Sequence, residues 1–178
     1  MKKSIFYSVF IFVLLMAFSQ SSAAQSFTLA NGKLGPVQVG KAIGKLPPRV
    51  AGLYDKYSLK KEEHEDMDGA WTEEYYQFVK AGKTIFKVYL EEGKVSAISL
   101  LPGSSFIKTP DGFYVGYPAQ KLYQQKKMQW EYYLSEPEAY ATSGHYTYGV
   151  AATDAKTNSM DQLIGFKPNA KVSIITYR

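Results

Sequence analysis

The sequence contains no cysteine, and its only histidines are His64 and His145. Without cysteine the chain has no disulfide, no thiolate nucleophile and no cysteine-ligated metal. No cysteine can carry a lipid either, so we expect no membrane tether. Neither histidine lies in a His-x-x-x-His motif or beside a Gly-x-Ser-x-Gly motif, which are signatures of metalloproteases and serine hydrolases. We therefore expect a protein that is not an enzyme and that uses no cofactor and no metal ion.

Long apolar runs are also scarce, with one exception at residues 5–18. Two lysines precede this run and four small residues follow it, a pattern that predicts a cleaved signal peptide over residues 1–24. Cleavage after Ala24 and cleavage after Ala23 both fit. The alternative, a membrane anchor, needs about 20 apolar residues, and the run is shorter. We expect a periplasmic or secreted protein of a bacterial envelope, with no transmembrane span after signal cleavage.

Charge of one sign does not accumulate in any part of the chain. The 21 lysines and arginines exceed the 16 acidic residues by only five, and both kinds are spread over both halves. Proteins that bind nucleic acid concentrate basic residues on one face. The sequence therefore argues against a nucleic-acid partner. A chain of this length can bury roughly two thirds of its unfolded surface, which is enough for a real core.

Two sequence echoes recur at nearly the same spacing. The stretch Lys94–Leu100 returns as Lys171–Tyr177 after 77 residues, and the Val-Gly and Lys-Leu pairs of residues 39–46 return in residues 115–122 after 76 residues. Two echoes in the same order predict an internal duplication. The repeats are expected at residues 25–103 and 104–178.

Each repeat is predicted to form a strand, a short helix and a three-stranded antiparallel meander, which gives an α+β fold class. The first helix is expected over residues 48–57, where Val50, Leu53, Tyr54 and Tyr57 form an amphipathic stripe. The second is expected to start at Pro118. Residues 60–69 are so highly charged that they are expected to form a solvated loop. The meander strands are expected at residues 71–80, 84–91 and 94–101, and at 144–152, 163–167 and 171–177, the last two as a closing hairpin; residues 130–140 are expected to form an aromatic connector.

The aligned repeats resemble the bacterial sigma-E-regulated envelope lipoprotein family, which is a domain of unknown function. The matching residues are Val115-Gly116, Lys121-Leu122-Tyr123, His145 to Tyr148, and Lys171 to Arg178. Members of that family carry a lipid-bearing cysteine, which this chain lacks, so membrane anchoring is not carried over. More loosely, the layout is similar to beta-lactamase inhibitor protein, whose two tandem α+β repeats form a concave, aromatic-rich binding face. This layout does not imply inhibition of a lactamase.

Two segments suggest a ligand site and fail on spacing. Residues 40–46 have too few residues between their glycines for a phosphate-binding loop, and Leu46 stands where a serine or threonine would bind magnesium. An acidic cluster offers carboxylates to a divalent cation but lacks the spacing of a calcium loop. It comprises Glu62, Glu63, His64, Glu65, Asp66 and Asp68.

Tyrosine is abundant, with 15 residues, and it is concentrated in the second repeat. Tyrosine and tryptophan anchor many interfaces, although aromatic residues also fill cores and strand surfaces. From this bias we predict a binding face composed of Trp130, Tyr132, Tyr133, Tyr146 and Tyr148.

The leading hypothesis is an exported, non-enzymatic module that binds an envelope protein or a cell-wall polymer. One alternative is a cell-wall hydrolase that uses His145 or the pair Glu73 and Glu74, although neighbours on a strand face opposite sides. Another is a structural envelope-stress protein.

Overall fold

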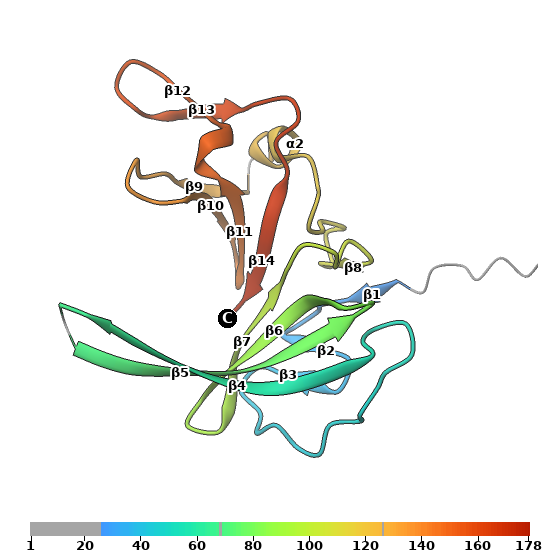
Figure 1. Cartoon of the computed structure of the whole chain (residues 1–178). Coiled ribbons are helices and arrows are strands. Elements are labelled where there is room, and N and C mark those ends of the chain that lie inside the picture. Colours follow the sequence, from blue (N-terminus) through green and yellow to red (C-terminus); the bar gives the residue numbers. More distant parts are fainter. Residues whose placement is uncertain (1–25, 68, 126) are drawn as a thin grey trace, which may run out of the picture.

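The computed structural model describes residues 26–67, 69–125 and 127–178, so the predicted signal peptide lies outside the described residues. One eight-stranded antiparallel sheet dominates the fold (Figure 1). Its strand order is β4 (Lys56–Asp66), β5 (Gly69–Lys80), β6 (Lys83–Glu91), β7 (Lys94–Leu100), β14 (Val172–Tyr177), β11 (Tyr146–Ala151), β10 (Glu138–Ser143) and β9 (Gln129–Glu131).

Smaller elements accompany this sheet. The strand pairs are β1 (Phe27–Thr28) with β8 (Ile107–Lys108), β2 (Lys33–Leu34) with β3 (Val37–Gln38), and β12 (Ala155–Thr157) with β13 (Leu163–Phe166). The helical elements are α2 (Ala119–Tyr123) and the 3-10 turn η1 (Ala152–Asp154). Among the described residues, no helix has the length and apolar character needed to cross a membrane.

The predicted α+β class is wrong, because the protein is mostly β, with 53% strand and 5% helix. The helix expected over residues 48–57 does not form; this segment consists of turns that lead into β4. Gly52 has a φ of +77°, which a right-handed helix does not tolerate. The expected second helix does begin after Pro118, but α2 has only five residues.

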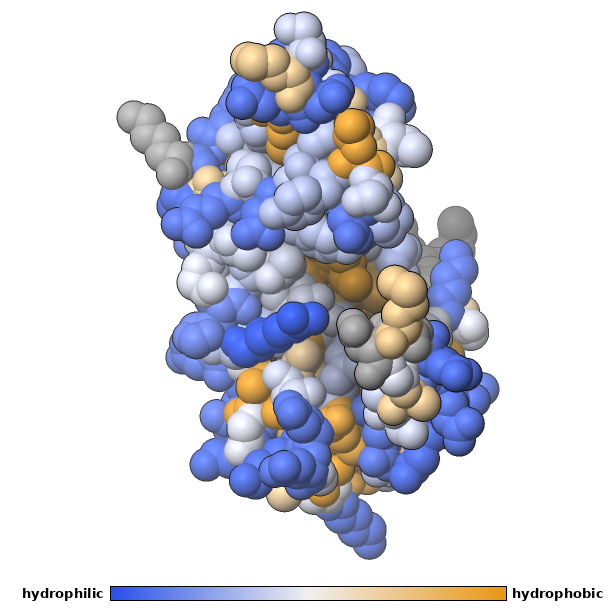
Figure 2. Space-filling model, turned by 90° about the vertical axis from the view of Figure 1, so that its left-hand side faces the viewer, coloured by the Kyte–Doolittle hydropathy of each residue, from blue (hydrophilic) through white to orange (hydrophobic). Residues whose placement is uncertain are grey.

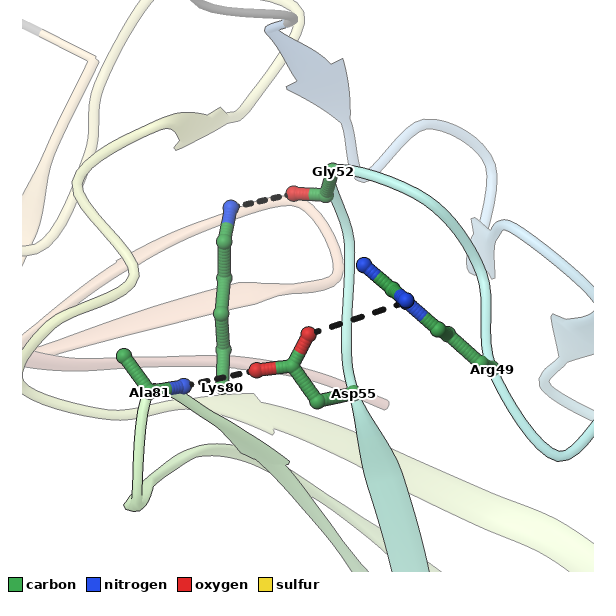
Figure 3. Close-up of polar contacts among 5 residues, drawn as sticks. All are labelled: Arg49, Gly52, Asp55, Lys80 and Ala81. Atoms are coloured by element: carbon green, nitrogen blue, oxygen red, sulfur yellow. Dashed lines mark hydrogen bonds and ion pairs between the residues drawn. The ribbon is translucent and has the colours of Figure 1, made fainter.

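Tertiary contacts hold the segment before β4 in its non-helical form (Figure 3). Asp55 Oδ2 accepts a hydrogen bond of 2.8 Å from the Ala81 amide, and Lys80 Nζ donates to the Gly52 carbonyl. Arg49 lies 3.9 Å from the other oxygen of the Asp55 carboxylate. These contacts tie the segment to the turn between β5 and β6, so its apolar stripe enters the core from an irregular backbone.

The charged segment at residues 60–69 is also not a loop, since it supplies most of β4 and the start of β5. Glu62 pairs with Glu73 and Lys61 pairs with Glu74 in an antiparallel register. The paired backbone satisfies its own hydrogen bonds, and the charged side chains of residues 60–65 stay at the surface on both faces of the hairpin. The expectation of a loop, which rested on the charged composition alone, is therefore wrong.

The sheet has two halves of four strands, β4 to β7 and β9, β10, β11 and β14. Equivalent backbone hydrogen bonds recur in them: Gly40 N donates to Val95 O, and Gly116 N donates to Val172 O, both at 2.8 Å. These residue pairs are separated by the offsets of the sequence echoes, and the duplication itself stays a prediction.

The second half departs from the first by an insertion. β13 pairs with β12, whereas β14 pairs with β11 and β7, so the predicted closing hairpin of residues 163–167 and 171–177 is wrong. The expected connector at residues 130–140 also contains strand, because β9 and the start of β10 lie there.

The core lies on one face of the large sheet, which α2 and the short strands β1 and β8 help to cover (Figure 1). Strand alternation sends the core-facing residues to that side. The largest buried side chains include Phe78, Phe86, Ile98, Leu100 and Tyr148. The other face of the sheet is left for solvent or a ligand.

Candidate functional site

The face of the large sheet opposite the core is hollowed. The hollow has a volume of about 810 Å³ and is lined by residues from every strand of the sheet except β4. Figure 2 looks onto this side and shows the depression between the upper and lower parts of the molecule. We call this depression the hollow. It joins the two halves of the sheet on a single surface.

The middle of the hollow lies where β7 meets β14. Ser99 and Thr176 are paired in register, and their hydroxyl oxygens are 2.8 Å apart. Their strand neighbours Ile98 and Ile175 are fully buried on the core side. The same alternation that fills the core thus lines the hollow with hydroxyl groups.

Glu138 on β10 is held in place on the upper wall of the hollow. Ser173 Oγ donates a hydrogen bond of 2.6 Å to Glu138 Oε1 and lies 2.9 Å from the Gly149 carbonyl oxygen. The serine is available because the register of β11 and β14 shifts between Gly149 and Val150, which leaves Ser173 as a bulge. Bulges commonly re-aim a side chain in this way.

Gly149 lets the Glu138 side chain lie across the sheet. A Cβ at this position would come within 2.6 Å of Glu138 Oε2 and 2.5 Å of Ile174 Cγ2. No real side chain fits there without moving one of them. The glycine and the serine bulge together fix the carboxylate, so this part of the wall is well ordered.

Aromatic side chains line the hollow from both halves, namely Trp71, Tyr89 and Tyr140. The Trp71 ring stacks on His64, with centroids 5.2 Å apart and an angle of 18° between the planes. Next to Tyr89, the Tyr75 ring has Lys87 Nζ 3.9 Å from its centroid. Lys87 therefore makes a cation–π contact with a ring that lies beside the hollow.

Burial and nearby carboxylates raise the pKa values of three tyrosines in or beside the hollow. The hydrogen bond to Glu62, with a smaller effect of burial, raises the pKa of Tyr75 to about 12. Burial raises the pKa of Tyr89, and the carboxylates of Glu73 and Glu62 raise it further. Burial likewise raises the pKa of Tyr140, with Glu138 adding to the effect. Each ring stays protonated because a phenolate would face these carboxylates.

One group of side chains beside the hollow has the composition of a metal site. The possible ligand atoms of Glu62, His64 and Glu73 all lie within 4.8 Å of one another, and His64 Nε2 is 3.9 Å from Glu73 Oε2. The His64 and Glu73 side chains are each 38% exposed. Exposed groups of this kind are common without an ion. The expectation of no metal stays a prediction.

This cluster differs from the acidic set that the sequence suggested. Strand pairing adds Glu73, which is distant in sequence, because it lies opposite Glu62. Glu63 and Glu65 alternate with Glu62 and His64 along β4, so they point to the other face. Asp68 lies outside the described residues.

The five predicted aromatic residues do not share an exposed surface. Tyr148 is 0% exposed, and Tyr146 donates a 2.7 Å hydrogen bond to the Leu29 carbonyl on the core side. Trp130 and Tyr132 are partly buried against the core, and Tyr133 is 61% exposed. Their binding role stays a prediction, but this placement does not favour it.

The residues that line the hollow were missed because the sequence does not show which face of a strand is covered. Alternation gave a usable signal in residues 138–142, where Glu138, Tyr140 and Thr142 face the hollow and Ala139 and Ala141 are buried. Alanine is small and only weakly hydrophobic, so Ala139 and Ala141 did not identify the buried face of this strand.

The residues considered for hydrolysis do not come together. His145 lies in the turn between β10 and β11, and the centroid of its ring lies 5.4 Å from that of Tyr177. Glu73 lines the hollow, whereas Glu74 forms an ion pair of 3.3 Å with Lys61. The segment at residues 40–46, considered for phosphate, has turns and a bridge in place of a helix.

The fold and the hollow define a mostly-β protein built on one eight-stranded antiparallel sheet. No family model matches the chain, and no curated protein matches it. Among solved structures, the chain is similar to the uncharacterized protein YfeY from Escherichia coli, with 18% sequence identity and a TM-score of 0.54. The match covers 84% of this chain and 97% of that one. At this identity the likeness shows the fold alone, and the resemblance to the sigma-E-regulated family stays a prediction.

Proposed function

We propose that this protein is an exported, non-enzymatic binding module of a bacterial envelope and that its ligand occupies the hollow. The observation that carries the proposal is the hollow itself, which spans both halves of one hydrogen-bonded sheet. Side chains on paired strands are held more precisely than side chains on loops, which suits a binding surface. Trp71, Tyr89 and Tyr140 offer wide amphipathic contact at a modest entropic cost.

Export is part of the proposal and rests on the sequence. The apolar run at residues 5–18, with lysines before it and small residues after it, has the organisation of a signal peptide. An envelope location would bring the hollow into contact with envelope proteins and cell-wall polymers, which are the two ligand classes expected from the sequence.

A capture experiment on envelope extract tests the binding role. The mature protein is compared with the variant Tyr89→Ala/Tyr140→Ala. This variant removes the tyrosine ring from each wall of the hollow. The matched control is Met160→Ala/Ile164→Ala, because both residues are exposed and neither lines the hollow. Circular dichroism verifies that each variant is folded, and mass spectrometry and sugar analysis identify what is retained.

A ligand that the control variant retains and the hollow variant loses supports the proposal. Equal retention by all three proteins, or no ligand in any of them, contradicts it. The comparison does not depend on the charge of the ligand, so it tests the hollow as a site separately from any particular ligand chemistry.

A further inference from the structure

The hollow has the opposite charge to the rest of the protein. The whole chain carries a net charge of +5, yet the charged residues that line the hollow are four glutamates and one arginine. They are Glu73, Glu91, Glu131, Glu138 and Arg178. A hollow lined by carboxylates in an otherwise basic protein attracts cations and repels anions.

One of these carboxylates is fixed in place. Glu138 accepts a hydrogen bond from Ser173 and lies over Gly149, where there is no room for a Cβ. A surface glutamate that serves only solubility needs no such support. A carboxylate held in one orientation loses less entropy when it binds a cation.

The aromatic rings of this face provide a second way of holding a cation. Lys87 Nζ already lies 3.9 Å from the centroid of Tyr75 and 6.0 Å from that of Tyr89. Such ammonium–ring contacts are favourable, and more so where water is excluded. Trp71 and Tyr140 offer further rings among the glutamates.

The remaining lining is suited to a peptide backbone. Thr142, Thr147 and Thr176 bring hydroxyl groups that both donate and accept hydrogen bonds. The volume of about 810 Å³ lies within the range of roughly 300–1,000 Å³ of sites that enclose a short ligand. The hollow crosses strands of both halves, so separate side chains of one segment can contact its two walls.

We propose that the hollow binds a lysine- or arginine-rich segment of a partner polypeptide, with Glu73 and Glu138 binding its cationic side chains from opposite walls. This inference rests on the proposed function and adds the chemical class of the ligand. A neutral saccharide could stack on the rings and donate hydrogen bonds to the hydroxyls and carboxylates, but it would gain no charge attraction, so its binding would not depend on salt. An anionic polymer would be repelled.

The test uses fluorescence anisotropy with three labelled peptides of equal length, in which lysine, glutamate or serine alternates with glycine. The mature protein is compared with Glu73→Gln/Glu138→Gln. The matched control, Glu63→Gln/Glu74→Gln, removes the same charge from the opposite face of the β4–β5 hairpin. We expect the lysine peptide to bind at least tenfold more tightly than the serine peptide, with the glutamate peptide weakest.

We expect Glu73→Gln/Glu138→Gln to weaken binding of the lysine peptide about tenfold and the control variant to change it less than twofold. Binding should also weaken when the salt concentration rises from 50 to 500 mM in this assay, because exposed charges are screened. An equal loss in both variants, or equal affinity for the lysine and serine peptides, overturns the inference.

A neutral chitooligosaccharide, tested against the same variants and against Tyr89→Ala/Tyr140→Ala, distinguishes this failure from failure of the proposed function. If the saccharide binds, is insensitive to salt and requires only the tyrosines, the hollow is a binding site but the ligand is not cationic. If neither probe responds to any substitution in the hollow, both proposals fail.

Discussion

The hydroxyl oxygens of Ser99 and Thr176 meet at 2.8 Å across the middle of the sheet, although 77 residues separate them in the chain. That separation is also the offset of the longer sequence echo. On either side of this pair, Ile98 lies opposite Tyr177 and Leu100 lies opposite Ile175. In the predicted duplication β7 and β14 are equivalent strands, and the structure pairs them with each other in antiparallel register.

This pairing explains how a duplicated unit could bury its own edge. A strand at the edge of a sheet presents unpaired backbone groups, and the same strand of a second copy can satisfy them. Isologous contacts of this kind are the commonest way in which two identical units associate. The hollow forms across this junction, so it would not exist in one half alone.

The Ser99–Thr176 contact is expected to stabilise the junction measurably. We predict that Ser99→Ala and Thr176→Val each lower the free energy of unfolding by about 0.5–1.5 kcal/mol, with a coupling of about 1 kcal/mol in the double-mutant cycle. Urea unfolding of the four proteins measures this coupling.

Thr147→Val serves as the control for that cycle, since Thr147 lines the same hollow beside Thr176. Its hydroxyl makes no hydrogen bond to another side chain in the part of the chain that the structure describes. Fully additive effects of the Ser99 and Thr176 substitutions would show that the contact contributes nothing.

Gly149 is expected to be sensitive to the smallest possible substitution. In Gly149→Ala the new methyl group meets Glu138 and Ile174 at distances that no real Cβ adopts, so one of the two must move. We predict a loss of roughly 1–3 kcal/mol in the free energy of unfolding, as in other overpacked sites. Thermal and urea unfolding both measure it.

Gly44→Ala is the matched control, because a Cβ at Gly44 has nothing within 4 Å. We expect a change smaller than about 0.5 kcal/mol there. If Gly149→Ala were as harmless as this control, the Glu138 side chain would not be held as the structure shows.

The sequence was informative where local patterns decide the structure. The strands at residues 71–80, 84–91 and 94–101 were predicted within a few residues, because alternating apolar side chains and the Glu92-Gly93 turn define them. The repeat offset equals the separation of Ser99 and Thr176, but the sequence did not predict that these two residues meet.

Elsewhere the tertiary structure overrode the local pattern. The stripe of Leu53 and Tyr54 has helical spacing, but both residues enter the core from turns that Asp55 and Lys80 tie down. The closing hairpin expected at residues 163–167 and 171–177 does not form, because β12 and β13 are inserted between β11 and β14.

The candidate site could not be predicted because its residues come from strands that are distant in sequence. Tyr146 and Tyr148 were expected to bind a ligand, but they face the core, and Tyr140 on the neighbouring strand faces the hollow. A sequence shows that strand residues alternate, but not which of the two faces is covered.

The buried hydroxyl of Tyr148 is expected to make the protein sensitive to alkali. Burial raises the pKa of Tyr148 from 10.0 to about 12. Between these values the unfolded chain loses its proton while the folded protein keeps it, so the free energy of unfolding falls as pH rises from about 10 to about 12. We predict a contribution of about 1–3 kcal/mol to this fall.

Tyr148→Phe should remove this contribution and should change stability little at pH 7. Thr109 lies near enough to oppose the effect of burial on the pKa, yet the Tyr148 hydroxyl has no hydrogen bond of normal geometry within the described ranges. Urea unfolding of both proteins at pH 7, 9, 10 and 11 measures the difference. If the free energy of unfolding fell with pH by the same amount in both proteins, the prediction would be contradicted.

The two possible cleavage sites of the predicted signal peptide give mature chains of different mass. Cleavage after Ala24 would leave Gln25 as the first residue, and cleavage after Ala23 would leave Ala24. Signal peptidases require a small residue immediately before the cut. We therefore expect Ala24→Leu to abolish cleavage after residue 24, because a leucine would stand immediately before that cut. Cleavage after Ala23 should remain, because the leucine would then be the first residue of the mature chain. Intact mass spectrometry of the periplasmic fraction identifies the product, and finding the uncleaved chain in the membrane fraction would show that residues 5–18 act as an anchor.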